Sequence, residues 1–270
     1  MEGIGLQYTN FLSNDLPQQH AKLFFHFTSV DKLSLILSNN CLKACNLVSM
    51  NDIREAELYH EFLAAYSNDI PQVIKEECKI LCFSKNMKGK NGIMRYGYKR
   101  PRMWAQYANN FTGCCLVIDE VEFKKENPKI NYEHGYFCDN VKYVNIIPTI
   151  PLCNSNDVYA FFKANSKSMF FTKQKDWSGE GEKRFVLFSK KNDVYFNIRK
   201  SLKAIIFAKS ISENVQIIYK LIDNEQIAEV ELYRLVNNNG HLGVISQEAV
   251  LNDILIKFGN LLKMTHENHL

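Results

Sequence analysis

The order of the short apolar runs along the chain constrains its fold more than any other feature of the sequence. Runs typical of strands gather in the middle of the 270 residues, and segments with helical spacing lie towards both ends. The regular strand–helix alternation that predicts a parallel sheet is missing from this order. No repeat or Pro/Gly/Ser-rich linker divides the chain. The sequence therefore predicts an α+β fold in a single domain over residues 1–270.

Local patterns place the individual elements. Ser29 is a good N-cap for a helix with Leu33 and Leu37 on one face, and Pro101 is suited to open a short helix. The predicted strands are 23–28, 79–84, 114–119, 141–147, 184–188, 203–207 and 227–234. The other predicted helices are 53–66, 158–169, 214–222 and 247–262.

Composition excludes several classes of protein. With 46% hydrophobic and 23% charged residues, the chain has the make-up of a globular protein rather than a fibrous or disordered one. No apolar run approaches the ~18 residues of a membrane span, and Met1–Ile4 does not open a signal peptide. Eight cysteines without an export signal indicate reduced thiols. We therefore expect a cytoplasmic protein with no membrane partner.

The common metal and nucleotide motifs are missing from the sequence. On a strand, Cys78 and Cys82 would lie ~13 Å apart, too far to bind one zinc ion. The chain has no Walker A loop, no G-x-G-x-x-G after a strand and no G-x-S-x-G elbow. The sequence therefore predicts no metal site, and it argues against the P-loop, Rossmann and α/β-hydrolase classes.

Two polar motifs stand at strand ends. His26 and Thr28 share one face of an otherwise apolar strand, where they are able to hydrogen-bond a ligand. Glu180 and Glu182 are ~6.6 Å apart on an extended chain between flexible glycines, and such a pair is able to stabilise an oxocarbenium-like sugar cation. The alternatives are a satisfied structural histidine and a solvated turn in which Arg184 pairs with Glu182.

Taken in order, the motifs resemble a bacterial family of uncharacterised domains that is often found near phage-defence genes. The resemblance spans residues 22–210 and leaves 211–270 as a C-terminal strand and helix extension. The residues that carry it are His26-x-Thr28, Asn51-Asp52-x-x-Glu55, Cys82-Phe83-Ser84, Trp104-x-x-Tyr107-Ala108 and Lys173-x-x-x-Trp177-x-x-Glu180-x-Glu182-x-Arg184.

The same motifs are similar to those of the ADP-ribosyltransferase superfamily, which binds and cleaves NAD. The resemblance implies a split mixed β-sheet core with flanking helices, NAD as the substrate and no metal. Glu182 would hydrogen-bond the nicotinamide ribose, Glu180 would orient or deprotonate the acceptor, and Tyr107 would stack on nicotinamide. The implied NAD-binding residues are His26 on the adenosine-side ribose, Thr28 at the nicotinamide subsite, Asn51 in a loop over NAD, Ser84 and Trp104.

A basic segment suggests the acceptor. Between Lys85 and Arg102 the chain has seven Lys and Arg and no acid, with Tyr96 and Tyr98 among them. Cations bind phosphates, and aromatic rings stack on unpaired bases. The candidate nucleic-acid-binding residues are Arg95, Lys99, Arg100 and Arg102. The alternatives are a solubilising loop and a cradle for the NAD pyrophosphate alone.

The sequence thus predicts an NAD-dependent ADP-ribosyltransferase, a bacterial toxin or anti-phage effector that modifies RNA, single-stranded DNA or protein, with an antitoxin as a partner. Two alternatives stay open: a nucleic-acid-binding module without NAD chemistry, and an NAD glycohydrolase. We also expect Glu182→Gln to leave the fold intact, because a carboxylate in a surface loop contributes little to stability.

Overall fold

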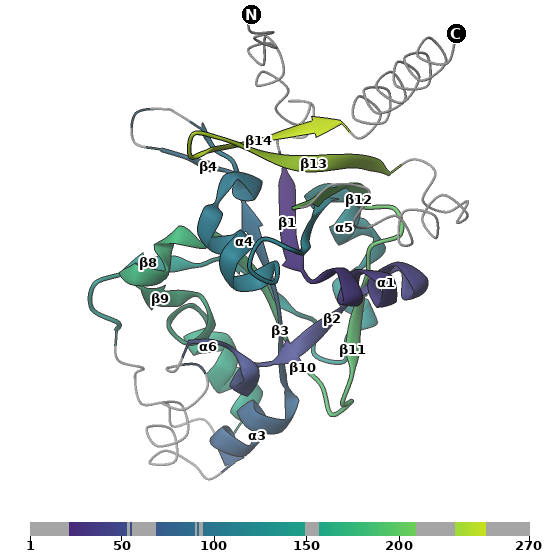
Figure 1. Cartoon of the computed structure of the whole chain (residues 1–270). Coiled ribbons are helices and arrows are strands. Elements are labelled where there is room, and N and C mark those ends of the chain that lie inside the picture. The colour runs from purple at the N-terminus through teal and green to yellow at the C-terminus, as the bar shows by residue number, and fades with distance from the viewer. Residues whose placement is uncertain are drawn as a thin grey trace, which may run out of the picture.

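The computed structural model describes residues 22–52, 55, 69–89, 91, 94–148, 157–208 and 230–246. One large mixed sheet dominates these residues, with helices packed against its faces (Figure 1). The predicted α+β class with a mixed sheet and flanking helices is confirmed. The extent of the domain over 1–270 stays a prediction, and the helices expected at 53–66, 214–222 and 247–262 lie outside the described residues, except Glu55 within the first of them.

The large sheet contains ten strands in the described part of the chain. All its pairings are antiparallel except that of β12 with β13. The main path runs β11 (Val194–Asn197), β2 (Cys41–Asn46), β3 (Cys78–Lys85), β1 (Leu23–Thr28), β6 (Cys114–Asp119), β12 (Leu202–Phe207), β13 (Glu231–Asn238) and β14 (His241–Ser246). Off this path, β10 (Glu182–Phe188) pairs with β3 and with β7 (Phe137–Asn140).

The sheet splits along one edge of β3. β10 pairs with the whole length of β3 from 78 to 84 on one side. On the other side β1 meets β3 only at Ser84 and Lys85, and β2 meets it only at Lys79 and Ile80. Within the described residues, 81–83 of β3 therefore have no ladder partner on this edge. The fork separates β1 and β6 from β2, β3 and β10, as the predicted split sheet requires.

Short helices cover both faces of the sheet. Side chains alternate between the two faces of the sheet along β1. Phe24 faces the core under α1 (Val30–Asn39) and α5 (Glu120–Glu126). Phe25 and Phe27 lie on the opposite face and pack against α4 (Pro101–Tyr107). Ser29 caps α1 as predicted, because its hydroxyl accepts from the Lys32 N–H at 3.4 Å. A third apolar cluster joins α3 (Asp69–Glu77) and α6 (Val158–Phe170) to β3 and β10 in the lower part of Figure 1.

Several element boundaries agree with the sequence and others do not. Strands 23–28 and 114–119 are confirmed to the residue, and α6 extends one residue beyond 158–169. The strand predicted at 141–147 is confirmed only over β8 (Lys142–Val144), which pairs with β9 (Thr172–Gln174); β7 precedes the predicted range. Strands β2, β11 and β14 were not predicted from the sequence. The basic segment 85–102 contains a small hairpin of β4 (Met87–Lys88) and β5 (Met94–Arg95) and the 3-10 turn η4 (Gly97–Lys99).

Three further observations concern the predicted class of protein. None of the described helices combines the length and hydropathy that crossing a bilayer requires. The cysteines among the described residues are free thiols. In the same part of the chain, no group of three or more His, Cys, Asp or Glu side chains is placed to bind a metal ion.

Candidate active site

Two buried carboxylates lie at the start of β10. Glu180 has no exposed surface and Glu182 is 5% exposed. Gly181, with φ +55°, turns the chain between them. The alternative of a solvated turn is therefore wrong for this pair, because both side chains lie beneath the loop rather than on it. For the same reason, the expectation that Glu182 is a surface-loop carboxylate is wrong.

Lys173 on β9 joins the two carboxylates. Its ammonium nitrogen is 2.9 Å from Glu180 Oε2, 3.2 Å from Glu182 Oε2 and 3.9 Å from an oxygen of Glu55. The Lys173 side chain is itself buried. A buried charge is tolerated only when it is paired, so these carboxylates hold the lysine in its charged form.

Arg184 forms the second cationic support. Its Nε donates to Glu182 Oε2 at 3.1 Å, as the sequence suggested for this pair. Its two terminal nitrogens contact both oxygens of Glu55, and one of them also donates to the Phe170 carbonyl at 2.9 Å. The guanidinium is wholly buried. This fork geometry fixes the direction of Glu55, and Nη2 also lies 2.9 Å from Glu182 Oε2.

The network holds more negative than positive charge. Glu55, Glu180 and Glu182 face two cations, Lys173 and Arg184, so that full ionisation leaves a surplus of one negative charge. A surplus charge away from water is costly unless a proton or a positively charged ligand neutralises it.

The surroundings push the pKa values of the two catalytic candidates apart. Burial, together with the charge of Glu182, raises the pKa of Glu180 above that of an ordinary glutamate. Burial acts in the same direction on Glu182, but Arg184 and Lys173 outweigh it and lower its pKa. Such a division is typical of acid–base sites, in which one carboxyl exchanges a proton and the other stays ionised.

Tyr107, at the end of α4, completes the surroundings of Glu180. Its hydroxyl donates to Glu180 Oε1 at 2.6 Å, and Asn51 hydrogen-bonds the same hydroxyl. Burial and the charge of Glu180 raise the Tyr107 pKa, so the phenol stays protonated and remains a donor. The structure thus brings together Glu180, Glu182, Tyr107 and Asn51.

His26 lies at the fork of the sheet, next to this cluster. Its Nδ1 is 3.3 Å from the carbonyl oxygen of Cys82 on β3, and the Cys82 thiol hydrogen-bonds Glu182. Burial lowers the His26 pKa to about 4, so the ring is neutral near pH 7. Cys82, Tyr107 and His26 each keep some exposed surface, and Asn51 is exposed. These side chains are the partly exposed neighbours of the two buried carboxylates.

The remaining predicted NAD-binding residues lie in the protein interior. Trp104 is wholly buried, packs edge-on against Phe27 and donates its indole N–H to the Tyr98 carbonyl. Thr28 is 4% exposed, and the Ser84 hydroxyl donates to the Glu180 carbonyl. Trp104 and Ser84 are thus occupied in supporting α4 and the Glu180 backbone, rather than presented to a ligand.

The basic segment packs over the loop before β10. Arg100 Nη1 donates to the Gly179 carbonyl at 2.7 Å and Nη2 to the Lys85 carbonyl at 3.2 Å. Arg102 donates to the Asp176 carbonyl at 2.6 Å. Both arginines therefore hold the candidate catalytic loop. Among the four predicted nucleic-acid-binding residues, Arg95 is exposed, and Lys99 lies over the rings of Tyr96 and Tyr98.

Gly181→Ala is expected to destabilise the fold by about 1–3 kcal/mol, because φ +55° is strained for a residue with a side chain. An added Cβ would also lie 2.3 Å from Nη2 of Arg100, which two carbonyls hold in place. Urea unfolding measures the loss. Gly179→Ala is the matched control: its Cβ would meet Arg102 only at an ordinary 3.4 Å, so a change within ~0.5 kcal/mol is expected. Equal effects at the two glycines would contradict this account.

Sequence reasoning named the residues of the network but assigned no role to Lys173, Glu55 or Arg184 as supports of the site. Lys173 is buried, whereas the nearby Lys163, Lys167 and Lys175 are exposed. Its position four residues before Trp177 in the last motif was the available signal. No periodic pattern links Glu55 to Arg184, because 129 positions separate them.

Comparisons with known proteins agree with the predicted recognition of an uncharacterised family. Residues 103–185 match the family described as "Protein of unknown function (DUF2971)". This segment contains Tyr107, Lys173, Glu180 and Glu182. No curated protein matches the chain. A similar solved structure is Thermus sp. 2.9 DarT in complex with ADP-ribosylated ssDNA; it is 10% identical, with 76% of this chain and 91% of that chain covered and a TM-score of 0.33.

Proposed function

We propose that the protein is an NAD-dependent ADP-ribosyltransferase. The surplus negative charge of the buried Glu55–Glu180–Glu182 network carries this proposal. The network matches a substrate on which positive charge builds, and the sequence motifs resemble those of enzymes that cleave NAD. A carboxylate that meets such a cation in a site shielded from water interacts more strongly with the transition state than with the ground state.

In this reaction the bond between nicotinamide nitrogen and ribose C1 breaks, and its electron pair moves to the nitrogen. The nicotinamide ring leaves uncharged, and positive charge appears on the ribose. Glu182, kept ionised by Arg184 and Lys173, stabilises that charge. An acceptor oxygen or nitrogen then bonds to C1 and loses its proton.

Glu180 is suited to take the proton of the acceptor. Its raised pKa makes it a better base than an ordinary carboxylate. Tyr107 and Lys173 hold its two oxygens, so that it is oriented before the acceptor arrives. His26 and Asn51 are the ligand-facing candidates for the ribose and the loop over NAD. Ser84 holds the Glu180 backbone and Trp104 supports α4, while Thr28 is buried.

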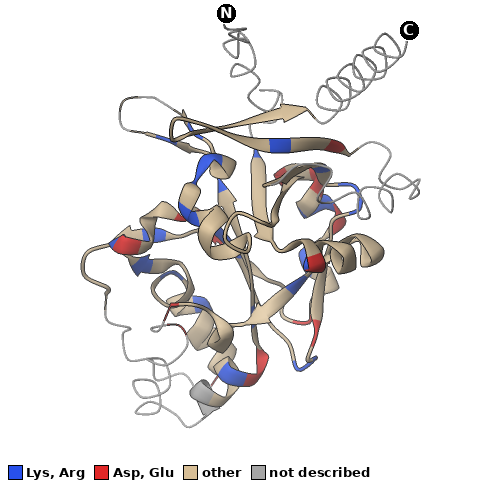
Figure 2. Cartoon of the chain, in the orientation of Figure 1, with Lys and Arg blue, Asp and Glu red and all other residues tan. Residues whose placement is uncertain are grey.

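The acceptor is the finer part of the proposal. We propose a nucleic acid, RNA or single-stranded DNA, and a role as a toxin or anti-phage effector with an antitoxin partner in the cytoplasm. The exposed Arg95 supports a phosphate-bearing acceptor. In Figure 2 the ribbons of α4 and α6 each carry positions coloured as Lys or Arg.

The test uses purified chain, NAD radiolabelled in its adenylate group, and a host-cell extract divided for nuclease or protease digestion. We expect label that survives protease and vanishes with nuclease. Label with the reverse sensitivity would place the acceptor among proteins. NAD loss without labelled macromolecule would favour the glycohydrolase, and unchanged NAD would favour the binding module.

The rate is expected to fall as the pH falls through the raised pKa of Glu180, because the protonated carboxyl no longer accepts a proton. The acidic limb should lie above the range of an ordinary glutamate, whereas Glu182 stays ionised through it. The measurement is kcat/KM for NAD against pH. Glu180→Gln should be slower and should lack this limb. A limb that persists unchanged in Glu180→Gln would assign it to another group.

A further inference from the structure

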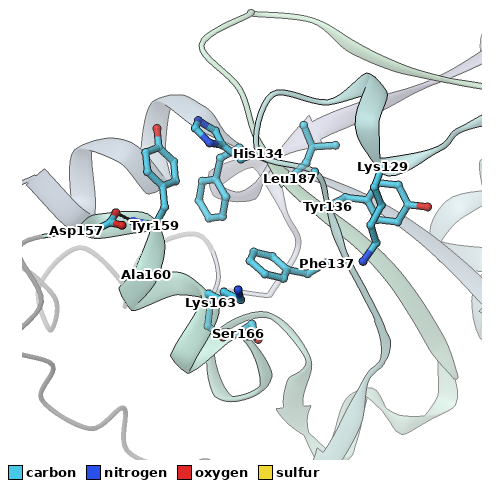
Figure 3. Close-up of a pocket in the computed structure, with 12 residues that line it drawn as sticks. Lys129, His134, Tyr136, Phe137, Asp157, Tyr159, Ala160, Lys163, Ser166 and Leu187 are labelled. Atoms are coloured by element: carbon cyan, nitrogen blue, oxygen red, sulfur yellow. Dashed lines mark hydrogen bonds between the residues drawn. The ribbon is translucent and has the colours of Figure 1, made fainter.

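A separate pocket of about 630 Å³ lies between α6 and the segment that leads into β7 (Figure 3). It is close to the Phe188 end of β10, whereas Glu182 begins that strand. Six residues of strand place the two ~20 Å apart. The pocket is therefore distinct from the candidate active site.

The lining combines aromatic surface with cations. At one end the rings of His134 and Tyr159 are stacked, 4.1 Å between centroids and 24° between planes. Phe137 lies at the centre of the pocket in Figure 3. Lys129 and Lys163 line it and are exposed. The aromatic rings are suited to stack on a planar base, and the lysine ammonium groups beside them are suited to bind a phosphate of the same ligand.

Two of the acidic groups near this pocket already have hydrogen-bond partners, and a third lies beside the His134 ring. Asp157 caps α6 by accepting from the Tyr159 N–H at 2.9 Å. The buried Glu77 accepts from the Tyr159 hydroxyl at 2.7 Å. Glu133 is exposed and lies 3.8 Å from the His134 ring. Lys129 and Lys163 are therefore the lining groups best placed to meet an anion.

Helix α6 connects this pocket to the candidate active site. Tyr159, Lys163 and Ser166 line the pocket, and at the other end of the helix the Phe170 carbonyl accepts from Arg184. Thirteen residues span ~20 Å at 1.5 Å each, in agreement with the length of β10. Lys163 and Lys167, both exposed, are four residues apart on one helix face. This face leads from the pocket towards the carboxylates.

We propose that this pocket binds a base of a single-stranded nucleic acid, whose phosphates follow Lys163 and Lys167 along α6 to the candidate active site. The inference rests on the proposed function, in which the acceptor is a nucleic acid. It specifies that this acceptor is an unpaired strand. About six stacked nucleotides at ~3.4 Å each would cover the ~20 Å between the two sites.

The test measures binding of fluorescein-labelled twelve-nucleotide DNA and RNA strands to the full chain by anisotropy, over a series of salt concentrations. The pocket variants are Lys129→Glu with Lys163→Glu, and Ala160→Trp, which adds a ring at the pocket wall. The matched control, Lys190→Glu with Lys191→Glu, makes the same charge change at two exposed lysines that do not line the pocket.

We expect both pocket variants to weaken binding at least tenfold. The lysine pair should also flatten the slope of log K against log salt by about 0.7 for each lost phosphate contact. The control should stay within twofold of the unaltered chain. Equal losses in pocket and control variants would overturn the proposal, because net charge alone would then explain the binding. So would strands that do not bind at all.

The outcome is separable from that of the proposed function. If the strands bind through the pocket but the chain leaves NAD unchanged, the pocket proposal stands and the transferase proposal fails. If label is transferred from NAD but the strands bind independently of the pocket, the pocket proposal fails and the transferase proposal stands. The same conclusion follows if protein alone is labelled.

Discussion

Glu182→Gln is expected to lower the rate of NAD-dependent transfer by about 10²–10³-fold, the usual cost of removing one electrostatic contact to a transition state. The amide keeps the size of the carboxyl but loses the charge that would stabilise the ribose cation. The assay is initial-rate transfer from radiolabelled NAD at saturating NAD, so that lost chemistry is separated from lost binding.

The fold of this variant is expected to survive for a reason different from the one that the sequence suggested. Without the Glu182 charge, Glu55 and Glu180 balance Lys173 and Arg184, and the surplus negative charge disappears. Thermal unfolding should therefore be close to that of the unaltered chain. Full activity in both Glu182→Gln and Glu180→Gln would refute the proposed chemistry.

Arg184→Met is expected to have the largest effect on stability, a loss of about 3–5 kcal/mol in the free energy of unfolding. The wholly buried guanidinium contacts Glu55 and Glu182. Its removal leaves three buried carboxylates facing Lys173 alone. Urea unfolding followed by tryptophan fluorescence measures the loss.

A second substitution separates the lost pairing from a mere change of shape. Glu55→Met combined with Arg184→Met restores the original charge balance, so much of the loss should be recovered. Lys43→Met is the surface control, because its partner Asp193 is likewise exposed; it should leave the unfolding midpoint unchanged. If Arg184→Met were as mild as this control, the buried network would have no structural role.

Local sequence patterns predicted the central elements well. Strands 23–28 and 114–119 are mainly apolar runs, and Ser29 and Pro101 are strong helix starts. Such signals depend on neighbours within a few positions. The short strands β2 and β11 were missed, because Lys43 interrupts the apolar run of β2 and β11 spans only four residues.

By itself, the sequence determined the α+β class and the identity of the candidate catalytic pair, Glu180 and Glu182. Only the tertiary structure decided that this pair is buried rather than solvated. That result depends on the convergence of Lys173 from β9, Arg184 from β10 and Glu55, which lies more than one hundred positions earlier in the chain. Burial and charge pairing are properties of groups that folding brings together, so no pattern along the chain encodes them locally.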